Sequence, residues 1–145
     1  MRAAIVTRAI DPAALVAEAT TADHGAVILF LGTVRDVNEG RAVSGIEYQA
    51  YEAMAARELE AIVAEAASAF GTDAIVVEHR VGRLGLGEAS VGIAVSHAHR
   101  APAYEVSRFV IEELKRRVPV WKREEYADGD REWVDPTRRH VEARS

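Results

Sequence analysis

The chain of 145 residues contains no cysteine and only two lysines, Lys115 and Lys122, against sixteen arginines. Without cysteine there can be no disulfide, no thiolate metal site and no cysteine nucleophile or persulfide. No apolar run is long enough to cross a bilayer, and the N-terminus lacks the pattern of a signal peptide. We therefore expect a cytoplasmic globular protein whose chemistry comes from other side chains.

The charge balance is acidic, with a formal net charge of −5. This balance argues against general binding to nucleic acids or membrane surfaces, and no strand carries a row of aromatic side chains for stacking RNA bases. Basic residues cluster instead around the two lysines, in the segment LKRRVPVWKREE at positions 114–125. A basic cluster within an acidic protein indicates a site for an anionic ligand.

The two lysines differ chemically from the arginines around them. A lysine ammonium that is buried or crowded by other cations gives up its proton more readily, so it can move protons or act as a nucleophile. Pro119 lies between the two lysines and must interrupt a helix, which lets both ammonium groups converge across a bend. We interpret Lys115 and Lys122 as catalytic residues.

Hydrophobic periodicity predicts an α+β fold with a mixed or antiparallel sheet and packed helices. Residues 26–34 form a nearly continuous apolar run, so we expect a strand buried on both faces, with residues 43–51 as its partner strand. Helices are expected from Asp11-Pro12 to His24-Gly25, over residues 52–70 and from about Pro102 to Val118; further strands are expected at residues 2–8, 74–81, 89–97 and 120–122. A single domain should cover residues 1–135, followed by a polar tail at residues 136–145.

Two sequence patterns resemble ligand sites, one for phosphate and one for a metal ion, but neither supports such a site. The glycine-rich run GRLGLG at positions 82–87 leads into a strand rather than a helix, so a hairpin-type connection is favoured over a phosphate loop. His97 and His99 could share a face, but no third ligand is close in sequence, and His79 lies on an apolar strand face as a core residue would. We expect no metal ion and no cofactor.

Two other segments are candidates for anion binding. In SHAHR, at positions 96–100, a strand ends and a helix begins, so backbone amides, Arg100 and an imidazole could together attract an anion. In Thr33-Val34-Arg35, the arginine closes an apolar strand and could reach into a cleft. An ordinary charge at the end of a strand is the plain alternative for Arg35.

Five segments, in order and at fitting spacings, resemble the large catalytic subunit of molybdopterin synthase over residues 25–133: GAVILFLGTVRD, IEYQAYEAMA, EHRVGRLGLGE, SHAHRAPAYE and LKRRVPVWKRE. The resemblance implies a fold of the α/β-hammerhead type and a sulfurtransferase of molybdenum cofactor biosynthesis. In that reaction, two sulfurs pass from C-terminal glycine thiocarboxylates of a small ubiquitin-like sulfur-carrier subunit to cyclic pyranopterin monophosphate. A homodimer at the centre of a heterotetramer is also implied.

The resemblance assigns roles to residues one at a time. Lys115 matches the lysine most important for the chemistry and Lys122 the second one, and the matched substrate-binding positions are Thr33, Val34, Arg35, His99, Arg100, Arg123 and Glu124. The sequence leaves open whether the His99-Arg100 pair acts within its own subunit or from the neighbour. A non-catalytic anion-binding or scaffold module that docks a partner's C-terminal tail is the alternative.

Overall fold

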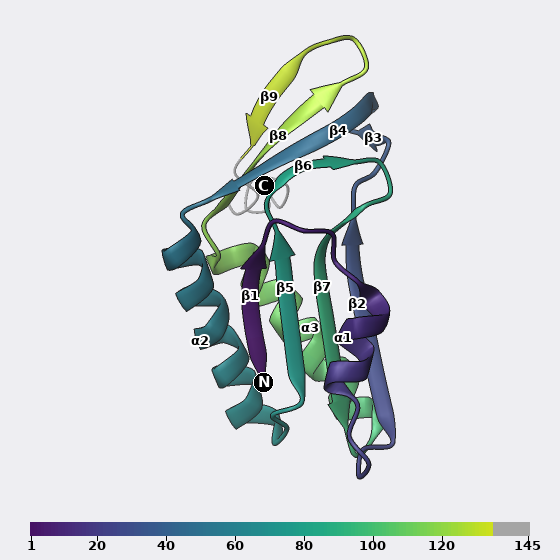
Figure 1. Cartoon of the computed structure of the whole chain (residues 1–145), viewed down its shortest axis with the longest axis vertical. Helices are drawn as coiled ribbons and strands as arrows, with labels where there is room; N and C mark the ends of the chain where they lie inside the picture. Colours follow the sequence, from purple (N-terminus) through teal and green to yellow (C-terminus); the bar gives the residue numbers. More distant parts are fainter. Residues whose placement is uncertain (135–145) are drawn as a thin grey trace.

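The computed structural model describes residues 1–134, and in this part of the chain nine strands and three helices form two sheets with helical cover (Figure 1). The strands are β1 (Arg2–Val6), β2 (Ala26–Thr33), β3 (Val37–Asn38), β4 (Arg41–Ala50), β5 (Ile75–Arg80), β6 (Gly82–Gly85), β7 (Ala89–His97), β8 (Val120–Tyr126) and β9 (Arg131–Val134). The helices are α1 (Pro12–Ala19), α2 (Glu52–Phe70) and α3 (Arg100–Arg117). The predicted tail at 136–145 lies outside the described residues. No helix among residues 1–134 is long and apolar enough to span a membrane.

The first sheet has the strand order β1-β5-β7-β2. β1 runs parallel to β5, whereas β5 and β2 both run antiparallel to β7. Helix α1 lies across one face and α3 across the other, while α2 packs against β1 and α3 (Figure 1). The main core fills the space between the sheet, α2 and α3, with buried residues that include Leu59, Ile62, Ile75, Val77, Ile93, Val95, Val106 and Val110.

The second sheet caps one end of the first and has the order β3-β4-β8-β9, with β6 also paired to β4 (Figure 1). One of its faces packs on the core through Ile46 and Tyr48, two of the three residues (Ile46, Tyr48 and Ala50) that the alternating pattern of this segment places on one face. The glycine-rich run at positions 82–87 leads from β5 through β6 into β7. It therefore contributes a short strand to the second sheet as well as the connection that the sequence predicts.

The α+β class and the main elements are confirmed, and α2 spans the predicted residues 52–70. Its C-cap, Gly71, has a left-handed φ of 71°, a conformation that glycine adopts without strain. Helix α1 begins as predicted, because the Asp11 carboxylate accepts hydrogen bonds from the amides of Ala13 and Ala14. It ends at Ala19, five residues earlier than predicted, where the amide and hydroxyl of Thr20 both donate to the Val16 carbonyl.

Two predictions about the second strand are wrong. β2 pairs with β7 and not with β4, because residues 41–50 join the second sheet instead. β2 is also an edge strand, so its residues from Ala26 to Gly32 are only half-buried rather than covered on both faces. An apolar edge strand of eight residues is unusual, because an unpaired edge is a template for association with another chain.

Candidate active site

A cavity of about 160 Å³ opens where the end of β2, the C-terminal part of α3 and the second sheet meet. We call it the lysine cavity, because Lys115 and Lys122 both line it. Of the nine candidate residues, it also contains Thr33, Arg35 and Glu124. The other lining residues are Gly32, Val37, Asn38, Val43, Ile46, Tyr48 and Ser90.

The sequence around Pro119 brings the two lysines together. Helix α3 buries the stripe Ala103, Val106, Val110 and Leu114 against the sheet, which puts Lys115 at the edge of that stripe near the helix end. Val118 caps the helix in extended conformation, and β8 then runs antiparallel to β4 with Lys122 opposite Tyr48. The predicted bend thus places one lysine on a helix and the other on a strand of the same cavity.

Lys115 is half-buried in the wall of the cavity. Its pKa is lowered below the ordinary value, mainly by burial and also by the positive charge of Lys122. Among residues 1–134, no carboxylate lies within ion-pair distance of its Nζ atom. An amine in this setting can exchange a proton during a reaction.

Lys122 has a counter-charge. Its Nζ atom lies 3.1 Å from Glu124 Oε1, and Glu124 is only 1% exposed. The other carboxylate oxygen of Glu124 accepts hydrogen bonds from the Tyr126 hydroxyl at 2.6 Å and from Asn38 Nδ2 at 2.5 Å. The same cavity therefore holds one lysine with a buried acidic partner and one without.

The floor of the cavity is neutral. The Ser90 hydroxyl donates to the Gly32 carbonyl at 3.2 Å, and the Tyr48 ring meets the His79 ring edge-on with centroids 5.4 Å apart. His79 is buried, as the sequence predicts, and its Nδ1 atom lies 3.0 Å from the Arg80 carbonyl oxygen. Burial lowers the pKa of His79 to about 4, so its imidazole adds no positive charge beneath Lys115 at neutral pH.

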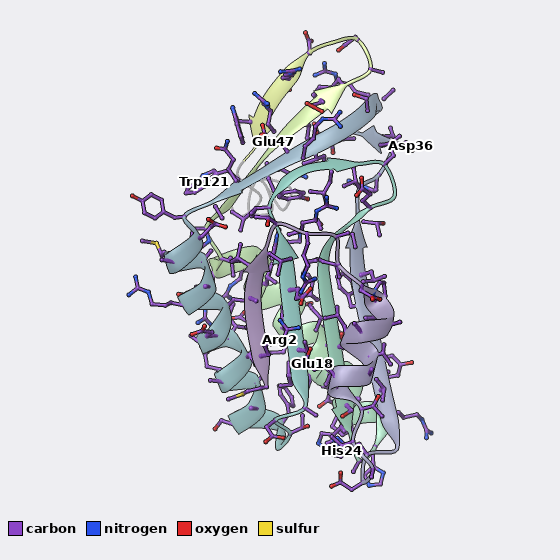
Figure 2. All side chains as sticks on the ribbon, viewed as in Figure 1. Arg2, Glu18, His24, Asp36, Glu47 and Trp121 are labelled. Carbon is purple, nitrogen blue, oxygen red and sulfur yellow. The ribbon has the colours of Figure 1, made fainter. Side chains whose placement is uncertain are left out.

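Val34 and Arg123 lie near the lysine cavity but do not line it. Val34 is buried, and its backbone is fixed by hydrogen bonds with the carbonyl of Glu88 and the amide of Gly87, both beyond β6. Arg123 points to the opposite face of β8 from Lys122. There it pairs with Glu47 at 2.5 Å and lies 5.2 Å from the centre of the Trp133 ring; Figure 2 labels Glu47 on the second sheet.

His99 and Arg100 lie at the opposite end of the molecule from the cavity within one subunit. They begin α3, whereas Lys115 is near its C-terminal end, about 22 Å away along the helix at 1.5 Å per residue. At the N-terminal end of α3, the neighbouring His97 stacks on His24, which Figure 2 labels at the far end of the molecule from the second sheet. A single subunit therefore does not bring the His99-Arg100 pair into the lysine cavity.

Sequence reasoning missed Asn38, Tyr48, Ser90 and Tyr126 as parts of the site. The alternating pattern places Tyr48 on one face of its strand, but alternation alone cannot separate a core residue from a cavity-lining one. Asn38 is in a polar hairpin and Tyr126 follows a charged run, so both resemble surface positions in the sequence. Their burial depends on the pairing of β3, β4 and β8, which only the structure supplies.

The chain is similar to proteins of known name. The family described as MoaE protein matches residues 5–117. A molybdopterin synthase catalytic subunit of Aspergillus fumigatus is 38% identical over 135 residues, which are 93% of this chain and 72% of that protein. The crystal structure of molybdopterin synthase from Staphylococcus aureus has a TM-score of 0.83 and 33% identity, covering 90% of this chain and 95% of that one.

A second solved structure is a complex of subunits 1 and 2 of the molybdopterin-converting factor from Helicobacter pylori. It has a TM-score of 0.71 and 24% identity, covering 91% of this chain and 89% of that one. At this level of identity, the likeness supports the fold alone.

Proposed function

The chain belongs to the MoaE family, and from this membership we propose that it is the catalytic subunit of a molybdopterin synthase. As such it converts cyclic pyranopterin monophosphate to molybdopterin, with sulfur from the C-terminal thiocarboxylate of a small ubiquitin-like sulfur-carrier subunit. Residues 1–135 are proposed as the catalytic domain and the cytoplasm as its location, which cell fractionation tests. The observation that carries the proposal is the lysine cavity, which holds Lys115, Lys122 and Arg35 together.

The charges of the cavity suit the proposed reactants. The substrate is a phosphate ester and the donor tail ends in a thiocarboxylate, so both are anions that Arg and Lys bind favourably. At about 160 Å³, the cavity is smaller than the ~300–1,000 Å³ of ordinary small-molecule sites. We propose that it admits the donor tail and the reacting part of the substrate, while the remainder of the substrate is held by residues outside it.

The proposed roles follow from the two lysine environments. The thiocarboxylate sulfur attacks a side-chain carbon of the pterin and displaces an oxygen substituent, which leaves a thioester to the donor glycine. Water then attacks the thioester carbonyl, releasing the glycine carboxylate and leaving the sulfur on the pterin. Lys115 takes up and returns the protons of these steps or stabilises the oxyanion, and Lys122 orients the donor carboxylate. Thr33 and Arg35 hold the substrate.

The edge position of β2 supports a homodimer that completes the site. If two copies pair antiparallel through β2 across a two-fold axis, the Ala26 end of one strand meets the Thr33 end of the other. Ala26 pairs with His97 in its own sheet, so the His97–Arg100 end of one subunit arrives beside Thr33 and Arg35 of its neighbour. We propose that His99 and Arg100 bind the substrate from the partner subunit, in a homodimer at the centre of a heterotetramer.

Reconstitution tests the function. The chain is mixed with thiocarboxylated small subunit and cyclic pyranopterin monophosphate, and the dithiolene product is measured. We expect product in proportion to the thiocarboxylate supplied, and none with a donor that ends in an ordinary carboxylate. Binding of the small subunit with no product would contradict the proposal and support a scaffold that merely docks the tail.

Subunit mixing tests the contribution of the partner. Lys115→Ala and Arg100→Ala homodimers should each be nearly inactive, but a mixed dimer contains one cavity with both native residues. After random exchange of subunits, activity should return to about a quarter of the native value, because about half the dimers are mixed and each has one intact cavity. If activity does not return although mass spectrometry detects mixed dimers, Arg100 does not act from the partner.

A further inference from the structure

Glu124 is at the centre of a buried hydrogen-bonded cluster in the wall of the lysine cavity. Its side chain accepts from Asn38 on β3, from Tyr126 on β8 and from the Lys122 ammonium, at distances of 2.5, 2.6 and 3.1 Å. Donors from two elements thus hold one carboxylate that is only 1% exposed. A carboxylate held this way is part of the protein framework, rather than a group free to bind an anionic substrate.

Within residues 1–134, Lys115 makes no ion pair with a carboxylate, although Glu124 lines the same cavity. The titratable or charged groups in or beneath the cavity are His79 on β5, Tyr48 on β4, Arg35 after β2, and Lys122 with Glu124 on β8. Burial raises the pKa of Tyr48, so its phenol stays neutral, and burial lowers the pKa of His79, so its imidazole is neutral as well. The one negative charge in this set, Glu124, is 3.1 Å from Lys122 and makes no ion pair with Lys115.

We propose that Glu124, held by Asn38 and Tyr126, is a positioning residue that keeps Lys122 as a fixed ammonium. This leaves Lys115 as the one amine of the pair that gives up its proton. The role of Glu124 in catalysis rests on the proposed function. The difference in protonation between Lys115 and Lys122 does not, because it is a property of the folded chain. The cluster around Glu124 thereby makes Lys115, rather than the chemically identical Lys122, the residue that moves protons.

The two lysines differ in their counter-charge. A buried ammonium is stable only when a carboxylate or other acceptors replace its lost hydration. Lys122 has such a partner in Glu124, and the positive charge of Lys122 in turn disfavours a second ammonium at Lys115. Burial, followed by the Glu124 carboxylate, raises the pKa of Tyr126, which keeps this phenol a hydrogen-bond donor to the acid.

The small number of lysines makes a direct test possible. Acetic anhydride in limiting amount acetylates an amine only in its unprotonated form. Peptide mass spectrometry over a pH series therefore follows the deprotonation of Lys115, Lys122 and the N-terminal amine separately. In the native protein, Lys115 should become reactive at lower pH than Lys122. In Glu124→Gln, which keeps the size of the side chain but not its charge, the ratio of Lys122 to Lys115 labelling should rise about tenfold, as expected for loss of a charge-assisted bond.

The neighbouring residue provides a matched control. Glu125 is also buried, but it pairs with Arg83 at 2.8 Å and with Arg131 at 4.0 Å, and it does not line the lysine cavity. Glu125→Gln should therefore leave the labelling ratio unchanged. The proposal is overturned if both native lysines become reactive at the same pH, or if Glu124→Gln behaves like Glu125→Gln. Should Glu124→Gln fail to fold, Tyr126→Phe removes one hydrogen bond to the acid and should change the ratio in the same direction, by about threefold.

A second experiment tests whether Glu124 acts by positioning Lys122 or by contacting the substrate. In single-turnover assays Glu124→Gln should lower dithiolene formation, but it should add no further loss in a Lys122→Gln background, because it acts through Lys122. An additional loss in that background would mean that Glu124 binds the substrate directly, and would overturn the positioning role. If the native chain makes no dithiolene, the proposed function fails while the labelling result still decides the protonation difference.

Discussion

The two sides of the lysine cavity differ more than their residue types suggest. On the α3 side, Lys115 makes no ion pair within residues 1–134, and its pKa is lowered by burial and by the charge of Lys122. On the β8 side, Lys122 is paired with a buried acid that Asn38 and Tyr126 hold in place. The comparison indicates that the neighbouring residues, rather than the lysine side chain itself, make Lys115 suited to proton transfer and Lys122 suited to positioning by charge.

Removal of the amine on the α3 side should have the largest effect. Lys115→Ala should fold and bind the small subunit, yet form dithiolene about a thousandfold more slowly, because a positioned proton-transfer group contributes ~10²–10⁴-fold. Single-turnover assays with thiocarboxylated donor measure the rate, and circular dichroism checks the fold. Near-normal product formation would contradict the role of Lys115.

The buried, neutral His79 beneath Lys115 should make the stability of the protein depend on pH in the acidic range. The pKa of His79 in the folded protein is about 4 against an ordinary 6.5, so the unfolded chain takes up this proton first as the pH falls. The stability that depends on neutral His79 is complete above about pH 6.5 and is lost progressively towards pH 4, by up to about 3 kcal/mol.

Urea unfolding at several pH values measures this loss. His79→Gln cannot take up the proton, so its stability should fall less over that pH range than that of the native chain. His99→Gln alters an exposed histidine and should retain the native pH dependence. Parallel curves for the native chain and His79→Gln would show that His79 is not held neutral.

The smallest effect should come from the residue beside Lys122. Arg123 points away from the cavity and pairs with Glu47 at the outer face of the second sheet. Arg123→Ala should keep dithiolene formation within about twofold of the native rate, since a partly exposed ion pair contributes little. A loss comparable to that of Lys115→Ala would mean that the cavity extends to the other face of β8.

The elements that could be predicted from sequence are those whose signals are local. Residues 52–70 have one apolar face and a glycine at the end, and they form α2 as predicted. Strand pairing is not local, so the sequence predicts the wrong partner for residues 43–51. The apolar composition of β2 predicts burial on both faces, although in one subunit this strand forms an unpaired sheet edge.

The candidate site likewise has features that depend on neighbouring residues and features that depend on contacts between distant ones. The bend at Pro119 let the convergence of Lys115 and Lys122 be predicted, because it depends on neighbouring residues. The roles of Asn38 and Tyr126 could not be predicted, because they arise from contacts that join β3 to β8 across 86 and 88 positions. The separation of His99 and Arg100 from the cavity follows from the length of α3, which places the pair and Lys115 near opposite ends of one helix.

The most direct test of the account compares Lys115→Arg with Lys122→Arg in the same single-turnover assay. Arginine keeps the positive charge but cannot give up its proton at working pH. If Lys115 moves protons and Lys122 acts by charge, Lys122→Arg should retain a substantial part of the dithiolene yield, whereas Lys115→Arg should be nearly inactive. Equal activity of the two variants would contradict the account, because charge alone would then suffice on both sides of the cavity.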